Sequence, residues 1–406
     1  MTRRFLLVPA LLVLVAGASS LLQGQTVSEW QDVIRHLRHP DPRERLDAVN
    51  QLAQAGYRGA AEAVAPLLTD PDDRVQAAAI DAQLAFFLAD RPGGGRFLNM
   101  GGGSRTPAQE AFEAGPLLLG GVAVPRVVLE QMLAAVRDEN SRVRFDAIHA
   151  FGFLAEAPLD ADLTKRLATE LDHYDPIIRA ATARIVGRLH AGAAAEAIAV
   201  AMVDSNPIVR RYATEATGLI DDEKSLATLR DQVVKLRGDM VEVSLLALAR
   251  IGAGEDLALF RERLQDRAPS IRRAAVEGLG RLVDRESMPA IETLLKDDRA
   301  AEVRLAAACA LQRMGQEQSH VIAPMLVLRE VNAQARDCLF EIGPAAVPGI
   351  HSTLRVATDS RHRFDLVQLI GYLGTSADVA VLEPMAADPD ERVRRAVGHA
   401  IARLRR

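Results

Sequence analysis

The chain has 406 residues, a formal net charge of −5, 25% charged residues and 49% hydrophobic residues. This length suits two or three ordinary domains or one long repeat array. Aromatic residues make up only 4% of the chain, and so few aromatics favour close-packed helices over sheets. The negative charge disfavours a generic nucleic-acid binder, because such proteins are usually basic.

The N-terminus reads as a secretory signal peptide, which we place at residues 1–25. Arg3 and Arg4 precede an apolar run over residues 5–18, and residues 16–18 offer a cleavage site of the Ala-x-Ala type. We therefore predict a periplasmic or extracellular protein that meets the membrane only transiently, through this segment. The alternative is an uncleaved N-terminal membrane anchor, because weakly apolar residues continue to Leu22. A spanning helix, however, needs about 20 apolar residues.

From residue 26 onward, one pattern recurs along the chain. The stretches "DPIIRAATARIVGRL" (175–189) and "NPIVRRYATEATGLI" (206–220) begin with Asp or Asn and Pro, and reach an Arg after a branched residue. With this Arg as position zero, most neighbouring copies are 31 residues apart. A fixed period of this size is typical of a solenoid. Position zero falls at Arg45, Gln76, Arg144, Arg179, Arg210, Val241, Arg272, Arg304, Asn332, Arg363 and Arg394.

Each repeat predicts two helices. The helix after the turn has apolar residues at positions −1, +3, +6/+7 and +10, which form one face of a 3.6-residue period. Its partner helix carries a recurrent proline, at Pro66, Pro289, Pro324, Pro348 and Pro384, which predicts a proline in the first turn or a bend. Position +8 is small, which allows close backbone approach, at Ala53, Gly152, Gly187, Gly218, Ala249, Gly280, Gly371 and Ala402.

These features resemble HEAT-type repeats, in the short form also found in phycobilin-lyase-like proteins. The matching elements are the D-P-x-x-[VI]-R motif, the following A-x-x-A-L-like run and the proline-bearing partner helix. The resemblance implies an all-α fold, an α-solenoid in the form of a right-handed superhelix of about eleven two-helix repeats. Repeats 1–2 occupy residues 26–90, an irregular Gly-rich insertion occupies 91–123, and repeats 3–11 occupy 124–406.

The insertion contains two Gly triplets, in the stretch "RPGGGRFLNMGGGSRTP" (91–107). A phosphate-binding loop would follow a strand and would end in Lys and Ser or Thr at a helix start. Here a helix is expected before the triplets, and no Lys occurs in 91–123, so nucleotide binding is not predicted. A flexible insert is one interpretation. The other is a docking loop anchored by Phe97, Leu98 and Met100, and a short helix is expected at 107–114.

Arginine at position zero predicts a structural ladder along the repeats. Such an Arg lies beside the apolar face and needs a partner there. Position −4 often carries Asp or Asn, which can cap the following helix or meet the Arg of a stacked neighbour. These −4 residues are Asp41, Asp72, Asn140, Asp175, Asn206, Asp359 and Asp390.

Positions +1, +5 and +9 of the helix after the turn form one stripe opposite the apolar face. The resemblance implies that this helix lines the concave face of the array. An Arg-rich stripe there would bind an acidic or phosphorylated partner, because Arg makes fork-shaped contacts to carboxylate and phosphate. The competing interpretation, which we favour from sequence alone, is a solvated face held by salt bridges. The candidate partner-binding arginines are Arg184, Arg188, Arg211, Arg250, Arg273, Arg281, Arg313 and Arg395.

No catalytic or metal-binding pattern emerges from the remaining residues. Only His36 and His39 have a ligand-like spacing, and the His-Glu pairs of HEAT-like di-iron hydroxylases are missing, so we predict no metal and no cofactor. No Gly-x-Ser-x-Gly elbow supports a hydrolytic triad. Cys309 and Cys338 fall in consecutive repeats. Stacked helices lie about 8–10 Å apart and a disulfide needs Cα atoms within about 7 Å, so we predict two separate thiols.

Together these patterns predict an exported, non-catalytic scaffold that binds a protein or peptide on its concave face and through the insertion. The first alternative is a bilin or tetrapyrrole lyase-like or ligand-chaperone activity, implied by the phycobilin-lyase-like resemblance. The export signal and the shortage of aromatics to hold a pigment weigh against it. The second alternative is nucleic-acid binding, as in HEAT-like DNA glycosylases, which conflicts with export and with the negative charge.

Overall fold

The computed structural model describes residues 30–88, 106–114 and 123–405. Within these ranges the chain forms α-helices and short 3-10 helices and contains no strand. The fold is an all-α solenoid of HEAT-like repeats, as the sequence predicts. Two compact units divide the chain, Met1–Glu156 and Ala157–Arg406. The predicted signal peptide and the apolar residues Phe97, Leu98 and Met100 lie outside the described residues.

Each repeat consists of a helix before the turn, the A helix, and a helix after the turn, the B helix. The described residues contain eleven B helices, one for each predicted position zero. They are α2 (Pro42–Ala55), α4 (Asp73–Phe87), α7 (Ser141–Leu154), α9 (Pro176–Arg188), α11 (Pro207–Leu219), α13 (Asp239–Ile251), α15 (Pro269–Arg281), α17 (Ala301–Arg313), α19 (Asn332–Ile342), α21 (Ser360–Leu373) and α23 (Glu391–Leu404).

The A helices are shorter, and three of them continue as 3-10 helices where a proline falls. Pro66, Pro324 and Pro384 lie in the 3-10 helices Ala65–Thr69, Ala323–Val327 and Glu383–Ala387, which confirms the expected bends. Residues 30–36 are helical before α2. The other A helices are α3 (Ala61–Val64), α6 (Arg126–Ala135), α8 (Ala161–Ala168), α10 (Ala195–Ala201), α12 (Leu226–Lys235), α14 (Leu257–Arg263), α16 (Met288–Asp297), α18 (Ser319–Ile322), α20 (Val347–Leu354) and α22 (Val379–Leu382).

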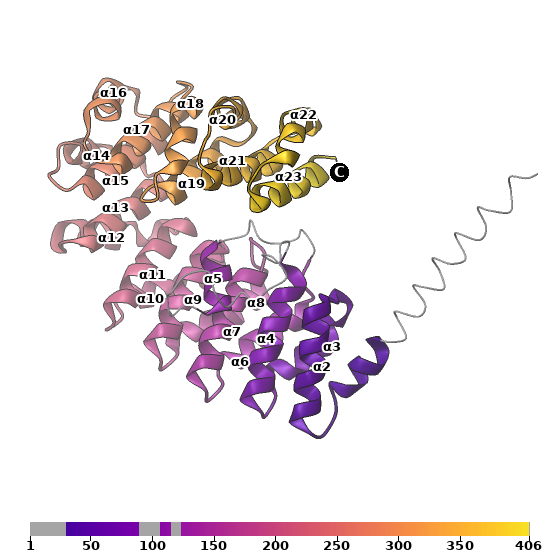
Figure 1. Ribbon diagram of the computed structural model, residues 1–406. Helices are drawn as coiled ribbons and strands as arrows, with labels where there is room; N and C mark the ends of the chain where they lie inside the picture. The colour runs from indigo at the N-terminus through magenta and orange to yellow at the C-terminus, as the bar shows by residue number, and fades with distance from the viewer. Residues whose placement is uncertain (1–29, 89–105, 115–122, 406) are drawn as a thin grey trace, which may run out of the picture. The chain divides into compact units, whose positions relative to one another are not determined.

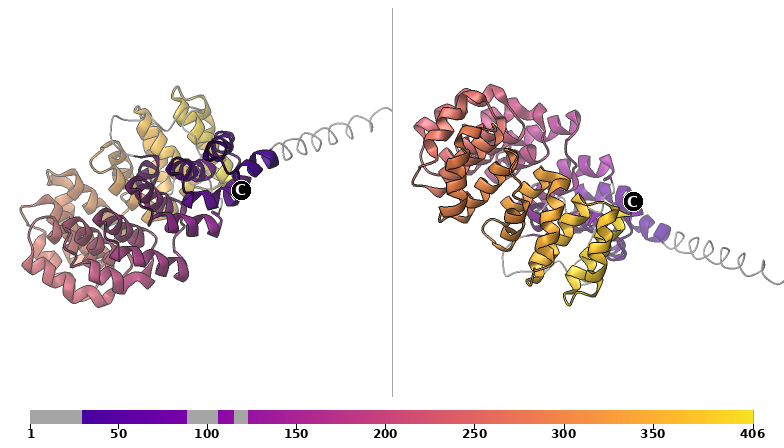
Figure 2. Two further views of the ribbon diagram at one scale, coloured as in Figure 1. Left: turned by 90° about the horizontal axis from the view of Figure 1, so that it is seen from below. Right: turned by 90° about the horizontal axis from the view of Figure 1, so that it is seen from above.

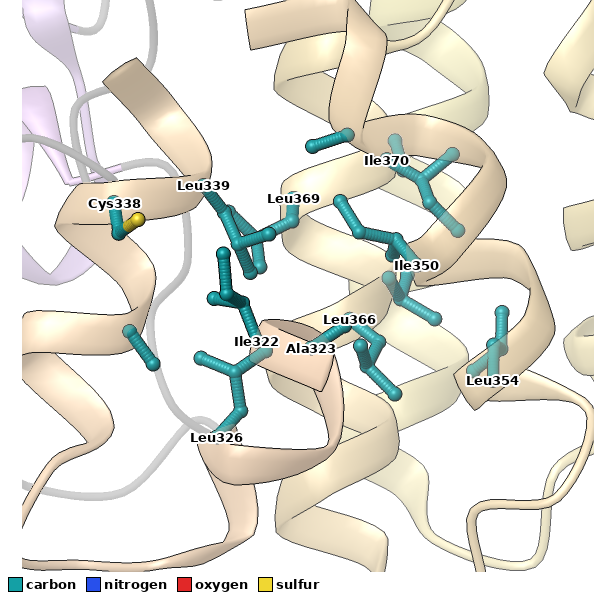
Figure 3. Packing of buried hydrophobic residues seen from close by; sticks show 14 of the residues in the cluster. Ile322, Ala323, Leu326, Cys338, Leu339, Ile350, Leu354, Leu366, Leu369 and Ile370 are labelled. Carbon is teal, nitrogen blue, oxygen red and sulfur yellow. The ribbon is translucent and has the colours of Figure 1, made fainter. Parts of the chain in front are cut away.

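Within the unit at 157–406, the A and B helices form two layers. The helices labelled α13, α15, α17, α19, α21 and α23 lie on the inner side of an arc, and α14, α16, α18, α20 and α22 lie outside them (Figure 1). Two further views show the same succession of stacked helices in chain order (Figure 2). The core lies between the layers: Ile322, Leu339, Leu366 and Ile370 are fully buried there (Figure 3).

The small residues at position +8 allow neighbouring B helices to touch. A Cβ added to Gly218 of α11 would lie 2.6 Å from the Cα of Ala247 in α13. A Cβ added to Gly280 of α15 would lie 2.7 Å from the Cα of Ala310 in α17. Real Cβ atoms do not approach so closely, so the predicted close contact at +8 is confirmed.

The −4 residues act as helix caps throughout the array. Each of the seven predicted Asp or Asn side chains accepts a backbone N–H from the first turn of its B helix. These caps satisfy donors that a helix start leaves unpaired. The proposed second role of position −4, meeting the Arg of a neighbouring repeat, is wrong.

In four repeats, the carboxylate partner of the position-zero arginine is instead the Asp at −6 of the next repeat. Arg272 donates from Nε and Nη2 to the two carboxylate oxygens of Asp298 at 2.8 and 2.9 Å. Its Nη1 donates to the backbone carbonyl oxygen of Asp266, in its own turn, at 2.8 Å. The same bidentate pair joins Arg45 to Asp70, Arg179 to Asp204 and Arg363 to Asp388.

In the unit at 1–156, the insertion contributes a packed helix. The short helix expected at 107–114 is α5 (Pro107–Ala114). Ala108, Ala111 and Phe112 are at most 2% exposed, and α5 contacts α7 and α4. This part of the insertion therefore belongs to the core of its unit.

Candidate functional site

The arginine stripe is the set of eight candidate arginines at positions +1, +5 and +9 of the B helices. All eight lie in the unit at 157–406, on α9, α11, α13, α15, α17 and α23. Every one of them is half-buried or exposed, so solvent reaches the whole stripe. Their surroundings differ, and these differences divide the stripe into a neutralised part and a basic part.

Arg273 belongs to the neutralised part. From α15, it reaches Glu242 of α13 at 2.5 Å and Glu302 of α17 at 3.8 Å. Its side chain is only 20% exposed. One guanidinium thus connects three consecutive B helices, and its charge is already balanced.

Arg281 and Arg313 converge on one carboxylate of α19. Arg281 lies 2.8 Å from Glu341 and 3.4 Å from Glu277, and Arg313 pairs with the other oxygen of Glu341. Desolvation alone would raise the pKa of Glu341, but the two arginines hold it below its usual range. Glu341 therefore stays charged, and both arginines remain occupied at neutral pH.

Arg395, on α23, pairs with Glu391 one turn earlier in the same helix. Most of these acidic partners lie on the same face as the arginines, because Glu242, Glu277 and Glu341 occupy positions +1, +5 and +9 of their own helices. Such pairs are what a face held by salt bridges predicts. Glu302 lies outside these positions, and the stacking of α15 on α17 brings it to Arg273.

The basic part of the stripe consists of Arg211 of α11 and Arg250 of α13. On α9, Arg184 packs over the ring of Tyr212, with 5.6 Å between its guanidinium carbon and the ring centroid, and Arg188 lies one turn further along. Among the described residues, no carboxylate lies within ion-pair distance of Arg211 or Arg250. This end of the stripe therefore keeps positive charge that an incoming acidic group can use.

In the unit at 1–156, the corresponding positions of α7 are aromatic and covered. The +1, +5 and +9 residues are Phe145, His149 and Phe153. The ring of His149 lies 5.5 Å from Phe112 of α5 and 4.3 Å from Phe145. The sequence analysis missed this contact, although aromatic residues at stripe positions were a signal that another element covers this face.

Cys309 and Cys338 form a disulfide, so the prediction of two separate thiols is wrong. Their Cα atoms are 6.2 Å apart, within the range that a disulfide spans. The prediction compared this limit with the distance between helix axes. Residues that face each other are closer than the axes, because each Cα lies about 2.3 Å from its own axis. The bond joins α17 to α19 beside a cavity of about 250 Å³ lined by Gln312, Arg313 and Glu341.

No group of three or more His, Cys, Asp or Glu side chains in residues 30–88, 106–114 and 123–405 is arranged to hold a metal ion. No helix in the same ranges is long and apolar enough to cross a membrane.

Comparison with known proteins identifies the repeats. A family profile of HEAT repeats matches residues 164–249 and 257–326. No curated protein sequence matches the chain. Protein-interaction scaffolds are a function that a HEAT-repeat solenoid suits, because each repeat adds surface to the array.

Solved structures with similar folds are distant in sequence. The complex of CpcE and CpcF of phycocyanin lyase from Nostoc sp. PCC7120 is 18% identical, with 59% of this chain and 94% of that chain covered and a TM-score of 0.41. The karyopherin Kap121p bound to the SUMO protease Ulp1p is 14% identical, with 93% and 45% covered and a TM-score of 0.39. Human deoxyhypusine hydroxylase is 19% identical, with 68% and 96% covered and a TM-score of 0.29.

Proposed function

We propose that this protein is an exported, non-catalytic scaffold that binds an acidic segment of a partner protein or peptide along the arginine stripe. The observation that carries the proposal is the basic part of the stripe on α11 and α13. Arg211 and Arg250 are accessible there, and no carboxylate among the described residues lies within ion-pair distance of them. The arginines of α15 and α17 contribute less, because Glu242 and Glu341 already neutralise them.

The disulfide supports the export part of the proposal. Disulfides persist in oxidising compartments and are rare where cytosolic reductants are present. The two cysteines of this chain are paired with each other. A basic segment, an apolar run and a small-residue site at the N-terminus favour the same compartment.

The first experiment measures binding of a short fluorescein-labelled poly-glutamate peptide by fluorescence anisotropy. The double variant Arg211→Ser, Arg250→Ser is expected to bind about tenfold more weakly at low salt, since two exposed charge contacts contribute roughly 1–2 kcal/mol. The binding is also expected to weaken with salt. The matched control removes the exposed arginines Arg285 and Arg299, which lie outside the stripe, and should bind as the wild type does.

Two results would contradict the proposal. One is equal loss of affinity in the control variant, which would mean that only net charge matters. The other is unchanged binding of Arg211→Ser, Arg250→Ser. Affinity capture from an envelope fraction with the same three proteins then identifies the natural partner as a protein retained by the wild type and the control alone.

The insertion is a second proposed contact, through Phe97, Leu98 and Met100. Deleting residues 91–123 would also remove α5, whose Phe112 is buried, and would damage the core. The triple variant Phe97→Ser, Leu98→Ser, Met100→Ser avoids this problem. We expect it to keep the wild-type melting temperature and to lose captured partner; unchanged capture would remove the insertion from the proposal.

A further inference from the structure

A second accessible surface runs along the edge of the array where each A helix turns into its B helix. In repeats 4–6 this edge exposes large apolar side chains, which we call the edge strip. Tyr174, Val203 and Val234 are 74%, 73% and 70% exposed, far more than side chains that serve a core. The strip consists of Tyr174, Ile177, Val200, Val203, Ile208, Val234 and Leu236.

The strip recurs at equivalent positions of three consecutive repeats. Position −2 carries Ile177 and Ile208, position −5 carries Tyr174 and Leu236, and position −7 carries Val203 and Val234. In each of repeats 4, 5 and 6, two of these three positions are therefore apolar. Equivalent positions in stacked repeats lie on one edge, so these side chains form one continuous line.

The fold itself does not require apolar residues at these positions. Repeats 7 and 8 have the same architecture, and they carry polar or charged residues there. Because repeats 7 and 8 fold without apolar residues at these positions, packing does not explain the apolar residues of repeats 4 to 6. Contiguous exposed apolar surface marks interaction sites. The six polar counterparts are Gln265, Arg267, Ser270, Asp297, Arg299 and Glu302.

A cavity lies within the strip, between the turns of repeats 4 and 5. Its volume is about 580 Å³, and Leu171, Tyr174, Val200 and Val203 line it. The pair Arg179–Asp204 forms part of the wall, but each carboxylate oxygen of Asp204 accepts from the guanidinium at 2.8 and 2.9 Å. This ion pair is thus already satisfied. The rest of the lining combines Leu171, Tyr174, Val200 and Val203 with Asp172 and His173, which suits an apolar side chain with a basic residue next to it.

We propose that the edge strip binds a peptide segment in the polyproline II conformation with a large apolar residue at every third position. Adjacent stacked helices lie about 8–10 Å apart. A polyproline II chain rises about 3.1 Å per residue with three residues per turn, so every third side chain faces the same side. Three residues of the peptide therefore match one repeat of the array. A peptide lying along the strip places one apolar side chain at each of repeats 4, 5 and 6.

Charge at the two ends of the strip specifies the flanks of this peptide. Asp172 stands at position −7 of repeat 4 and Asp239 at position −2 of repeat 6, and both are exposed. Among the described residues, neither has a cation within ion-pair distance. At the repeat 6 end, however, the exposed Arg237 lies two residues before Asp239. The preferred peptide therefore carries a basic residue at the repeat 4 end, beside Asp172, which distinguishes it from the acidic segment proposed for the arginine stripe.

The test uses two labelled peptides of one composition. The first has Leu at every third position with Ser and Thr between, and Lys at one end; the second has Leu at every second position. We expect the intact protein to bind the first peptide more tightly, and Val203→Ser, Val234→Ser to reduce that binding about tenfold, in line with the apolar surface lost from two contacts. Both side chains are exposed, so the melting temperature should not change.

The matched control is Val327→Ser, Val356→Ser. These valines are exposed at positions −5 and −7 of repeats 9 and 10 and line a cavity of about 460 Å³ there. Exposed valines at these positions span only two repeats, so binding of a peptide that contacts three should be retained. Equal binding of the two peptides, or equal loss in the control, would overturn the proposal. A wild-type dimer in light scattering that dissociates in Val203→Ser, Val234→Ser would assign the strip to a second copy of this chain instead.

Discussion

Arg272 shows how one side chain joins two repeats. It closes its own turn by donating to the Asp266 carbonyl oxygen, and it reaches across to both oxygens of Asp298. Its side chain is 16% exposed and that of Asp298 is 4% exposed. Burial alone would raise the pKa of Asp298, but the bond to Arg272 holds it below its usual range.

Removing this arginine tests the ladder. Arg272→Met leaves a buried carboxylate without its cation, and we expect the free energy of unfolding at pH 7 to fall by about 3 kcal/mol. A carboxylate with a lowered folded pKa stabilises the fold above its unfolded pKa, near 4, and loses that effect as pH falls through the folded value. The difference between wild type and variant should therefore shrink from pH 5 to pH 3, measured by urea denaturation.

The exposed pair of Arg392 and Asp390 is the control for this measurement. Arg392 is 60% exposed in its side chain, so Arg392→Met should leave the urea midpoint nearly unchanged. A similar loss in both variants, or a loss that does not depend on pH, would show that the ladder is not the source of the stability.

At this same scale, the sequence predicted the capping residues but not the ladder partners. Both −4 and −6 carry acidic residues in many repeats, such as Asp390 and Asp388. A cap is a local contact, so its position follows from sequence spacing. The partner of Arg363 is chosen by the geometry between two repeats, and it is Asp388.

At the scale of elements, the contact between α11 and α13 depends on Gly218, which has no Cβ atom. Gly218→Ala would place Cβ 2.6 Å from the Cα of Ala247, so the two helices must move apart. We expect a loss of about 1–3 kcal/mol, the usual cost of overpacking. The matched change is Gly398→Ala in α23, where no atom lies within 4 Å of the new Cβ.

Gly398→Ala should be neutral or stabilising by up to about 1 kcal/mol, because alanine favours the helix. Thermal melting of both variants gives the comparison. If Gly218→Ala melted at or above the wild-type temperature, the B helices would not be in the close contact described for position +8. Gly398 lies in the middle of α23 and Gly218 in the last turn of α11, and helix propensity alone favours alanine at both positions.

Element boundaries followed well from the repeat, but the role of the insertion did not. The repeat motif predicted every B helix, because its apolar face recurs in each. Helix α5 lies outside the repeat, and its contact with His149 joins segments that no local pattern connects. Glu242 and Glu341 lie at stripe positions +1 and +9, so their pairs with arginines agree with a face held by salt bridges.

At the scale of the whole molecule, stability is spread over repeats that contact only their neighbours. The interval from Arg304 to Asn332 is shorter than the 31-residue period, and Asn332 replaces the arginine of position zero there. The disulfide between Cys309 and Cys338 joins repeats 8 and 9 at this place. This disulfide can hold the irregular junction together only in an oxidising compartment, where disulfides persist.

Export by the N-terminal segment and formation of the disulfide are therefore expected to occur together. Full-length protein produced in a bacterial host is expected in the periplasmic fraction, with a new N-terminus close to residue 25 and no thiol that reacts with maleimide before reduction. Protein lacking residues 1–25 should stay in the cytoplasm with two reactive thiols once unfolded, and it should be less stable by about 2–4 kcal/mol, the usual contribution of a disulfide.

The variant Cys309→Ser, Cys338→Ser in the full chain should still be exported, which separates targeting from oxidation. A full-length protein that keeps its N-terminus and sediments with membranes would instead establish the anchor alternative, and one that stays in the cytoplasm would remove export from the proposed function.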